Sequence, residues 1–178
     1  MLFEKEGLRV RELLQRDKLL LVNWLSNPVV LEYYEGRDNS FDLEKVDDKF
    51  YNCNDDVSRC IIEFEGKDLG YIQYYRFDEM TSKIDDYSEK EIIYGIDQFI
   101  GEPDYWNRGI GTLLVKSMVE YLIEQKQADR VVMDPQVQNE RALKCYEKCG
   151  FNKVRILPEH EFHEGKYRDC WLIEYKNP

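Results

Sequence analysis

The segment of residues 91–134 constrains the fold more than any other part of the chain. Residues 91–101, EIIYGIDQFIG, have the composition of a buried strand, and residues 109–127, GIGTLLVKSMVEYLIEQKQ, repeat apolar side chains at helical spacing. Residues 128–134, ADRVVMD, then return as a strand. Because a helix that crosses over a sheet joins parallel strands, the segment predicts a parallel strand pair covered by a helix.

The remainder of the chain predicts further strands and helices around this unit. Residues 57–64 and 68–77 flank Glu65–Gly66–Lys67 and predict a β-hairpin. The other expected strands cover residues 8–14, 151–158 and 167–175, and the other expected helices cover residues 15–28, 29–36, 40–52 and 139–150. We expect one α/β domain over residues 1–178, with a mixed, partly parallel β-sheet flanked by helices.

Acidic residues outnumber basic ones, and the formal net charge is −11 at pH 7. Nucleic acid and anionic membranes are therefore disfavoured as partners, and a polycationic small molecule is favoured, although an acidic surface also serves solubility alone. No apolar run approaches the roughly 20 residues that span a bilayer, and the first residues lack the basic and apolar regions of a signal peptide. Five cysteines without a C-x-x-C pair fit reduced thiols. We expect a cytoplasmic protein.

Asp97 stands near the middle of the apolar strand at residues 91–101. Aspartate is disfavoured inside strands, and burial of a carboxylate costs free energy unless the carboxylate has partners. The residue therefore indicates that a cleft opens at this strand. An edge position that faces water is the alternative.

Gly109 and Gly111 open the helix that follows this strand. Glycine lets a ligand approach the backbone closely, and the first N–H groups of a helix have no internal partner. The helix start is therefore suited to a phosphate or pyrophosphate, although a packing turn is the alternative. The dinucleotide fingerprint fails because residue 114 is leucine, and the P-loop fails because no G-K-[ST] follows.

A stripe of cations on the helix at residues 139–150 also suits an anionic cofactor, and a solvated helix face explains it equally well. The stripe consists of Arg141, Lys144 and Lys148. The two histidines, at positions 160 and 163, miss the spacing of the zinc motif H-E-x-x-H because residue 164 is glutamate. We expect no metal site.

Three stretches bring a known family into view. They are YGIDQFIGEPDYWNRGIGT (94–112), MDPQVQNERALKCYEKCGF (133–151) and LPEHEFHEGKYRDCWLIEY (157–175). The chain resembles the GNAT acetyltransferases, and within them the aminoglycoside 6′-N-acetyltransferases. The resemblance extends over nearly the whole chain. It implies a single acetyltransferase domain that takes acetyl-coenzyme A and a cationic aminoglycoside.

The family's Q/R-x-x-G-x-G/A loop corresponds to residues 106–111, where Trp106 departs from the family's Gln or Arg. The resemblance implies that this loop holds the cofactor pyrophosphate and that the strand backbone pairs with the pantetheine arm. The residues implied in cofactor binding are Gln98, Phe99, Ile100, Arg108, Gly109, Ile110, Gly111, Thr112, Asn139, Ala142 and Lys148.

The resemblance also implies two catalytic residues. Asp97 matches the family's catalytic carboxylate, and Tyr146 matches the tyrosine that the family places near the sulfur. We expect Asp97 to hold the substrate ammonium and either accept its proton or only position it. Tyr146 would protonate or steady the departing thiolate. The reaction needs neither a metal nor a covalent enzyme intermediate.

The expected substrate contacts are less specific than the catalytic pair. Besides Asp97, the positions Asp134 and Asp169 match acidic residues that line the family's drug site. Tyr34 and Asp86 are further candidates for the cleft wall, although a core position or a solvated loop is an equal alternative for most such residues.

Two other interpretations stay open. Within the superfamily, the substrate is instead a protein N-terminus, a lysine or a polyamine. In a different class, the chain is a non-catalytic acyl-coenzyme A sensor, although the presence of both Asp97 and Tyr146 weighs against a sensor. The expected assembly is a monomer or a weak homo-oligomer.

Overall fold

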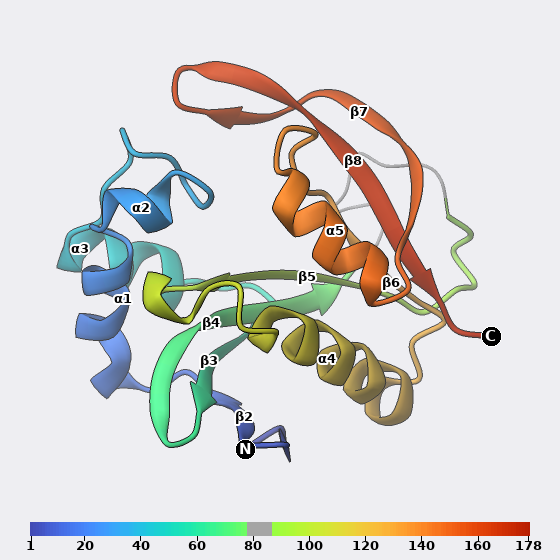
Figure 1. Cartoon of the computed structure of the whole chain (residues 1–178), viewed down its shortest axis with the longest axis horizontal. Helices are drawn as coiled ribbons and strands as arrows, with labels where there is room; N and C mark the ends of the chain where they lie inside the picture. The colour runs from blue at the N-terminus through green and yellow to red at the C-terminus, as the bar shows by residue number, and fades with distance from the viewer. Residues whose placement is uncertain (78–86) are drawn as a thin grey trace.

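The computed structural model describes residues 1–77 and 87–178. Eight strands form one sheet in the order β1-β2-β3-β4-β5-β6-β8-β7 (Figure 1). The strands are β1 (Phe3–Lys5), β2 (Leu8–Glu12), β3 (Ser58–Phe64), β4 (Lys67–Arg76), β5 (Ile93–Ile100), β6 (Arg130–Met133), β7 (Asn152–His163) and β8 (Lys166–Lys176). The helices are α1 (Lys18–Trp24), α2 (Pro28–Leu31), α3 (Leu43–Val46), α4 (Ile110–Lys126) and α5 (Glu140–Lys148), and the π-helical segment η2 (Asp47–Tyr51) continues α3. In this part of the chain, no helix is both long and apolar enough to cross a membrane.

The sheet is mixed, as the sequence predicts. Strands β1 to β5 pair antiparallel in chain order, whereas β5 and β6 pair in parallel, with α4 as the crossover between them. Strands β6 and β7 each pair antiparallel with β8. The predicted β3–β4 hairpin also forms. Its turn residues Glu65 and Gly66 have φ angles of 49° and 82°, which suits the tight two-residue turn that matches strand twist.

Strand β1 and helices α1 and α2, at the N-terminal side, differ from the sequence prediction, and α1 covers only Lys18–Trp24 of the helix predicted at residues 15–28. Strand β1 is not visible in the pattern, because its three residues are half-buried or exposed and show no apolar alternation. Helix α2 is shorter than the helix predicted at residues 29–36. Glu35 and Gly36 adopt φ angles of 73° and 101°, and this left-handed backbone ends the helical path.

Strand β7 is longer than predicted and continues past Pro158 to His163. The strand lies at the edge of the sheet. A proline is tolerated there because an edge strand has a side on which its residues need not donate a hydrogen bond to a neighbouring strand. Its register with β8 shifts between Leu157 and Glu161, as in a β-bulge, which re-aims the side chains that follow.

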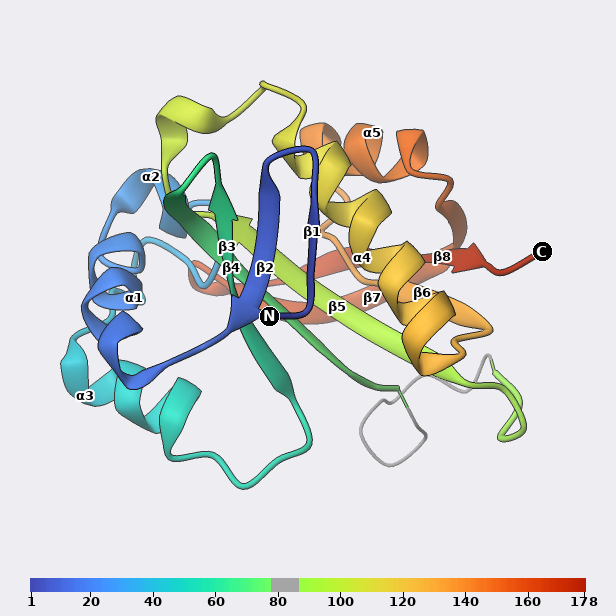
Figure 2. The same cartoon turned by 90° about the horizontal axis from the view of Figure 1, so that it is seen from below.

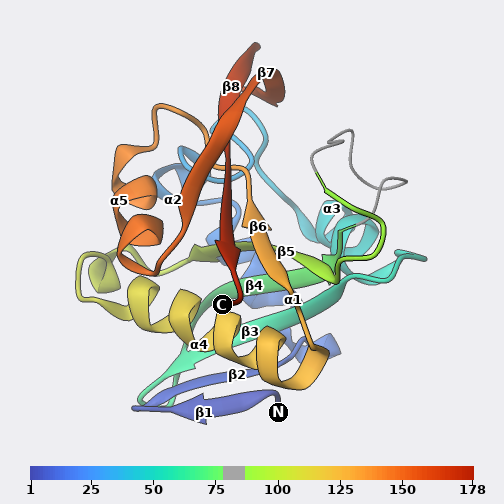
Figure 3. The ribbon, with the colours of Figure 1, turned by 90° about the vertical axis from the view of Figure 1, so that its right-hand side faces the viewer.

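Helices cover both faces of the sheet (Figures 2 and 3). On one face, Leu114, Met118 and Leu122 of α4 are fully buried in a core that also includes residues of β2 to β6 and α5. On the other face, helices α1 to α3 pack around Tyr71 and Phe99 of the sheet. Each fully buried leucine contributes about 1.5–3 kcal/mol relative to an exposed one, so both layers hold β4 and β5 firmly in place.

The strands β5 and β6 diverge in the middle of the sheet. They pair over three residues, from Ile93 opposite Arg130 to Gly95 opposite Val132. Strand β5 then continues to Ile100 along β4, and within the described structure its other edge has no strand partner beyond Gly95. An opening is therefore built into the sheet next to Asp97.

The tip of the β7–β8 hairpin meets the segment that follows α2 (Figure 1). Glu164 at the tip accepts hydrogen bonds from the backbone N–H of Arg37 at 3.1 Å and from its guanidinium. His163 Nε2 lies 2.9 Å from the carbonyl oxygen of Glu32. These contacts join the two sides of the molecule that flank the opening in the sheet.

Candidate active site

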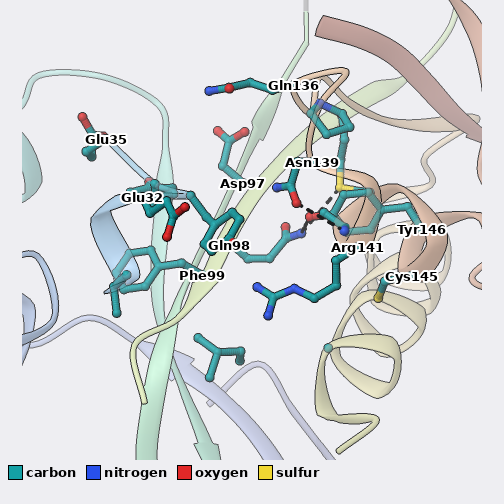
Figure 4. Close-up of a pocket in the computed structure, with 18 of the residues that line it drawn as sticks. Glu32, Glu35, Asp97, Gln98, Phe99, Gln136, Asn139, Arg141, Cys145 and Tyr146 are labelled. Carbon is teal, nitrogen blue, oxygen red and sulfur yellow. Dashed lines mark hydrogen bonds between the residues drawn. The ribbon is translucent and has the colours of Figure 1, made fainter. Parts of the chain in front are cut away.

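A cavity of about 1460 Å³ occupies the opening between β5 and β6 (Figure 4). Its lining reaches from the N-terminal turn of α4, past β5, to the tip of the β7–β8 hairpin. Asp97 and Gln98 both line it, although adjacent residues of a strand point to opposite faces of a sheet. The cavity therefore passes through the sheet, and two ligands that approach from opposite faces can meet at β5.

Asp97 sits opposite Gln73 in the β4–β5 register. The Gln73 Nε2 donates to Asp97 Oδ2 at 2.9 Å, and the Tyr71 hydroxyl donates to Gln73 Oε1 at 2.7 Å. Burial raises the pKa of Asp97 to about 6, and the nearby Asp134 adds to the rise, whereas hydrogen bonds from Gln73 and Tyr75 lower it. The carboxylate is thus ionised at neutral pH, but it is a much better proton acceptor than an ordinary aspartate.

Tyr146 projects from α5 toward the same cavity (Figure 4). Its hydroxyl oxygen accepts a hydrogen bond from Gln98 Nε2 at 2.8 Å. Burial raises the pKa of Tyr146 above its ordinary value, so the phenol stays protonated. With its oxygen already serving as an acceptor, the hydroxyl proton is available for a neighbouring group. The cavity thus joins a proton acceptor on β5 to a proton donor on α5.

The cavity ends at the start of α4, where the sequence predicts an anion site. Gly109 is the N-cap residue, with a φ of 79°, and a side chain there would meet no atom within 4 Å. The backbone N–H groups of the first turn have no partner inside a helix, and both Gly111 and Thr112 line the cavity. The helix dipole adds a partial positive charge at this point. The geometry therefore suits a bound anion.

The predicted cofactor residues divide into two sets. The structure brings Gln98, Phe99, Ile100, Gly109, Gly111, Thr112, Asn139, Ala142 and Lys148 together along the cavity. Arg108 and Ile110 are not in the lining. The Arg108 side chain is exposed, with its guanidinium 5.1 Å from the centre of the Tyr105 ring. The Ile110 side chain is buried, so Ile110 has only its backbone to offer a ligand.

The Trp106 side chain has a hydrogen-bond partner that the sequence does not reveal. Its Nε1 donates to the carbonyl oxygen of Ile100 at 2.9 Å, which ties the loop to the end of β5. The guanidinium of Arg141 lies 4.3 Å from the Trp106 ring centroid and 5.0 Å from that of Tyr33. A cation from α5 therefore lies over the position where the family has Gln or Arg.

The far end of the cavity is acidic. Asp134 lines it and is hydrogen-bonded to His160 Nε2 at 2.7 Å, a contact that raises the pKa of His160. Glu161 also lines the cavity and accepts a hydrogen bond from Gln136 Nε2 at 2.6 Å. Asp97 and Glu161 are thus both hydrogen-bonded by a glutamine amide, which stabilises a carboxylate without cancelling its charge.

The remaining predicted substrate contacts have different positions. Tyr34 lines the cavity, and its ring centroid lies 4.6 Å from that of Phe99. Asp169 is not in the lining, and its Oδ1 accepts a hydrogen bond from the backbone N–H of Glu159 at 2.9 Å. Asp86 lies outside the described residues.

Sequence reasoning misses Gln73 and Glu161. Gln73 lies on a strand that looks like an ordinary hairpin arm, and only the β4–β5 register places it against Asp97. Glu161 lies beyond the predicted end of its strand, and its place depends on the register shift in β7. Among the residues that the structure describes, no group of three or more potential metal ligands is found.

Comparison with known proteins gives a consistent result. Residues 14–158 match the family model described as an acetyltransferase (GNAT) domain. The chain is 27% identical over 154 residues to the aminoglycoside N(6′)-acetyltransferase type 1 of Klebsiella pneumoniae, which covers 83% of this chain and 75% of that protein. It is 23% identical over 177 residues to the spermidine N(1)-acetyltransferase of Escherichia coli (strain K12), which covers 93% of this chain and 89% of that protein.

A solved structure shares the fold. The structure of AAC(6′)-Ib in complex with ribostamycin and coenzyme A matches this chain with a TM-score of 0.79 at 24% sequence identity, over 97% of this chain and 94% of that one. The match confirms the predicted fold class, a mixed sheet flanked by helices.

Proposed function

The chain belongs to the GNAT acetyltransferase family, and we propose that it transfers the acetyl group of acetyl-coenzyme A to the 6′-amine of aminoglycoside antibiotics and so confers resistance. The observation that carries the proposal is the pairing of Asp97 with Tyr146 across one cavity that passes through the sheet. Asp97 has a pKa near 6 and Tyr146 keeps its proton. An amine acetyltransferase can use one group of each kind, the first to accept the proton of the amine and the second to donate a proton to the thiolate.

In this proposal, the coenzyme lies between β5 and α5. The first-turn N–H groups of α4 bind its diphosphate, as helix N-termini bind phosphate elsewhere. The edge of β5 beyond Gly95, which has no strand partner among the described residues, pairs with the amide-bearing arm. Arg141, Lys144 and Lys148 supply positive charge along the same wall.

The chemistry follows from the two proton-handling groups. Asp97 holds the substrate ammonium by a charge-assisted hydrogen bond and accepts its proton, which frees the lone pair that attacks the thioester carbon. A backbone N–H of β5 near Phe99 stabilises the tetrahedral oxyanion. Tyr146 donates its proton to the departing thiolate. Since a thiol has a pKa of about 8.5, this last step needs the least assistance.

The substrate class is supported by charge and by the relatives. The net charge of −11 and the acidic end of the cavity favour a polycation. Asp97 and Glu161 provide two separate carboxylates for ammonium groups of one substrate. The 27% identical relative is an aminoglycoside 6′-acetyltransferase.

A polyamine is the second candidate substrate, because a spermidine acetyltransferase aligns over 93% of the chain. A linear polyamine also satisfies the acidic cavity. It differs from an aminoglycoside in having no rigid rings, so charge alone does not separate the two. A protein N-terminus, a lysine side chain and a sensor role without turnover are further alternatives.

We place this activity in the cytoplasm, in a single domain over residues 1–178 that works as a monomer or weak homo-oligomer. All five cysteines are free thiols, which fits a reducing compartment. Sedimentation of the purified protein checks the assembly.

Thiol release from acetyl-coenzyme A tests the proposed function directly. The purified protein is assayed with aminoglycosides that carry a 6′-amine, with matched aminoglycosides that carry a 6′-hydroxyl, and with spermidine. We expect turnover with the 6′-amines and little with the other two. Equal turnover with the 6′-hydroxyl drugs, or a preference for spermidine, would reject the 6′-aminoglycoside assignment. Coenzyme binding without turnover on any amine would indicate a sensor.

A further inference from the structure

Asp97 is the end of a chain of hydrogen bonds that runs along β4. The Tyr71 hydroxyl donates to Gln73 Oε1 at 2.7 Å, and Gln73 Nε2 donates to Asp97 Oδ2 at 2.9 Å. Tyr71 has no exposed surface, and its ring packs between Phe50 and Phe99, with centroids at 5.1 Å and 5.7 Å. The start of this chain is therefore held rigidly in the core.

We propose that Tyr71 and Gln73 are positioning residues that hold Asp97 in its ionised form and reserve one of its two oxygens for the substrate amine. This inference rests on the proposed amine acetylation. It assigns a role to two residues that lie outside the catalytic pair.

The direction of these hydrogen bonds follows from the two ends of the Gln73 amide. Gln73 has a donor end and an acceptor end, and its Oε1 accepts the Tyr71 proton in the observed orientation. If the amide flipped, Oε1 would face an ionised Asp97, which also offers only acceptors, and the Tyr71 proton would lose its acceptor. Tyr71 therefore favours the orientation in which Gln73 donates to Asp97, and this orientation stabilises the charged carboxylate.

Apart from Gln73 and Tyr75, the groups around Asp97 oppose its ionisation. Burial and the negative charges of Asp134, after β6, and Glu161, on β7, favour the protonated form. Tyr75 on β4 adds a hydrogen bond to the carboxylate, and the phenols of Tyr34 and Tyr146 lie near it without charge. Among the described residues, the groups that lower the pKa of Asp97 are hydrogen-bond donors and not cations, so the amide of Gln73 is a main source of stabilisation for the charge before the substrate binds.

The hydrogen bond from Gln73 also gives the two oxygens of the Asp97 carboxylate different roles. Gln73 donates to Oδ2, and the ammonium of the substrate is assigned to Oδ1. The carboxylate can accept the hydrogen bond from Tyr75 as well, because its two oxygens together offer about four lone-pair sites. A carboxylate that is held at one oxygen cannot rotate freely, so its second oxygen stays aimed into the cavity. Such orientation lowers a barrier by removing the search for a reactive geometry.

The test is a ¹³C NMR titration of the Asp97 carboxyl, with its signal identified by its loss in Asp97→Asn. Gln73→Met removes the amide but keeps the length of the side chain, and Tyr71→Phe removes the hydroxyl but keeps the ring. We expect the pKa of Asp97 to rise from about 6 by about one pH unit in Gln73→Met and by less in Tyr71→Phe.

Tyr74→Phe is the matched control. Tyr74 is also a buried tyrosine on β4, but it packs in the core on the opposite face of the sheet, against Tyr121. Loss of its hydroxyl should leave the pKa of Asp97 unchanged. The acid limb of the pH profile of kcat/KM should move with the NMR value in each variant, whereas a merely structural defect would lower the rate at all pH values alike.

The outcomes separate this inference from the proposed function. An Asp97 pKa that is the same in the wild type, Gln73→Met and Tyr71→Phe would overturn the positioning role, even in an active enzyme. A wild-type protein that acetylates no amine would reject the proposed function. The NMR titration needs no substrate, so the pKa values of Asp97 in the wild type and the two variants would still test the positioning role. Tyr71→Phe is the milder change and keeps the test valid if Gln73→Met folds poorly.

Discussion

Gln98 Nε2 donates a hydrogen bond to the hydroxyl oxygen of Tyr146 at 2.8 Å, which joins the strand that carries Asp97 to the helix that forms the opposite wall. Asp97 and Tyr146 are therefore each held by a glutamine amide, from Gln73 and Gln98 respectively. One amide stabilises a negative charge, and the other leaves a phenol proton free. The cavity is therefore arranged so that Asp97 on β5 can accept a proton and Tyr146 on α5 can donate one.

The two catalytic residues should differ in importance. Asp97→Asn keeps the shape of the side chain but removes the base, and we expect kcat/KM for the amine to fall by about 10²–10⁴-fold. Tyr146→Phe should lower kcat by only about tenfold, because the thiolate is a good leaving group. Steady-state kinetics with each variant measures both effects, and a larger loss in Tyr146→Phe than in Asp97→Asn would contradict the assignment of roles.

Activity should depend on the ionisation of Asp97. With a pKa of about 6, the carboxylate is mostly protonated below that pH, so kcat/KM should rise as the pH increases through 6. In Asp97→Asn, the residual kcat/KM should not show this rise between pH values below and above 6. A wild-type profile that stays flat between about pH 5 and 7 would show that the carboxylate does not take part.

The same group should make the protein less stable at neutral pH than in mild acid. Because the folded pKa of Asp97 is raised above 3.8 to about 6, the folded state binds a proton more tightly than the unfolded chain between these values, and stability falls as the pH rises through them. Asp97→Asn cannot ionise and should increase the free energy of unfolding by up to about 3 kcal/mol at about pH 8, with little effect at about pH 4. Urea unfolding at the two pH values measures the difference, and a variant that is destabilised at both would be evidence against a carboxylate whose charge is destabilised by desolvation.

The glycine at the start of α4 should matter for the coenzyme beyond its effect on folding. Gly109 and Gly66 have φ angles of 79° and 82°, and a side chain at either would meet no atom within 4 Å. Alanine should therefore cost a similar amount of stability at both positions, about 1–2 kcal/mol. Only Gly109 lines the cavity.

Titration calorimetry with coenzyme A separates these two effects. We expect weaker binding by Gly109→Ala, about tenfold, and unchanged binding by Gly66→Ala, which alters the β3–β4 turn. Equal affinity in both variants would mean that the diphosphate does not approach the N-terminal turn of α4.

Encounter with a polycationic drug should weaken with ionic strength. The net charge of −11 and the acidic end of the cavity attract the drug at a distance, and salt screens this attraction. We expect kcat/KM for the drug to fall severalfold between about 0.05 and 0.5 M salt, while kcat changes much less. A kcat/KM that does not respond to salt would remove the electrostatic argument for the substrate class.

Local patterns in the sequence predict the parts of the fold that depend on short-range rules. The parallel β5–β6 pair follows from the strand–helix–strand pattern of residues 91–134, and the β3–β4 hairpin follows from its turn residues. Asp97 is recognisable as a site residue because a charge interrupts an apolar strand. In each case a local conflict or signal is visible in a few consecutive residues.

The rest of the site depends on tertiary register, which no local pattern records. Gln73 reaches Asp97 only because of the cross-strand pairing of β4 with β5, and Glu161 faces the cavity only because β7 shifts its register and extends past Pro158. Arg141 lies over Trp106 because α5 packs against the loop before α4. These contacts join segments far apart in the chain, so single residues in the sequence carry no sign of them.

A crystal structure of the complex with coenzyme A and a 6′-amine aminoglycoside tests the central claim most directly. We expect a diphosphate against residues 109–112, a coenzyme sulfur near the Tyr146 hydroxyl, and a 6′-nitrogen within hydrogen-bond distance of Asp97 Oδ1. A diphosphate bound away from α4, or a drug that presents a different nitrogen to Asp97, would contradict it.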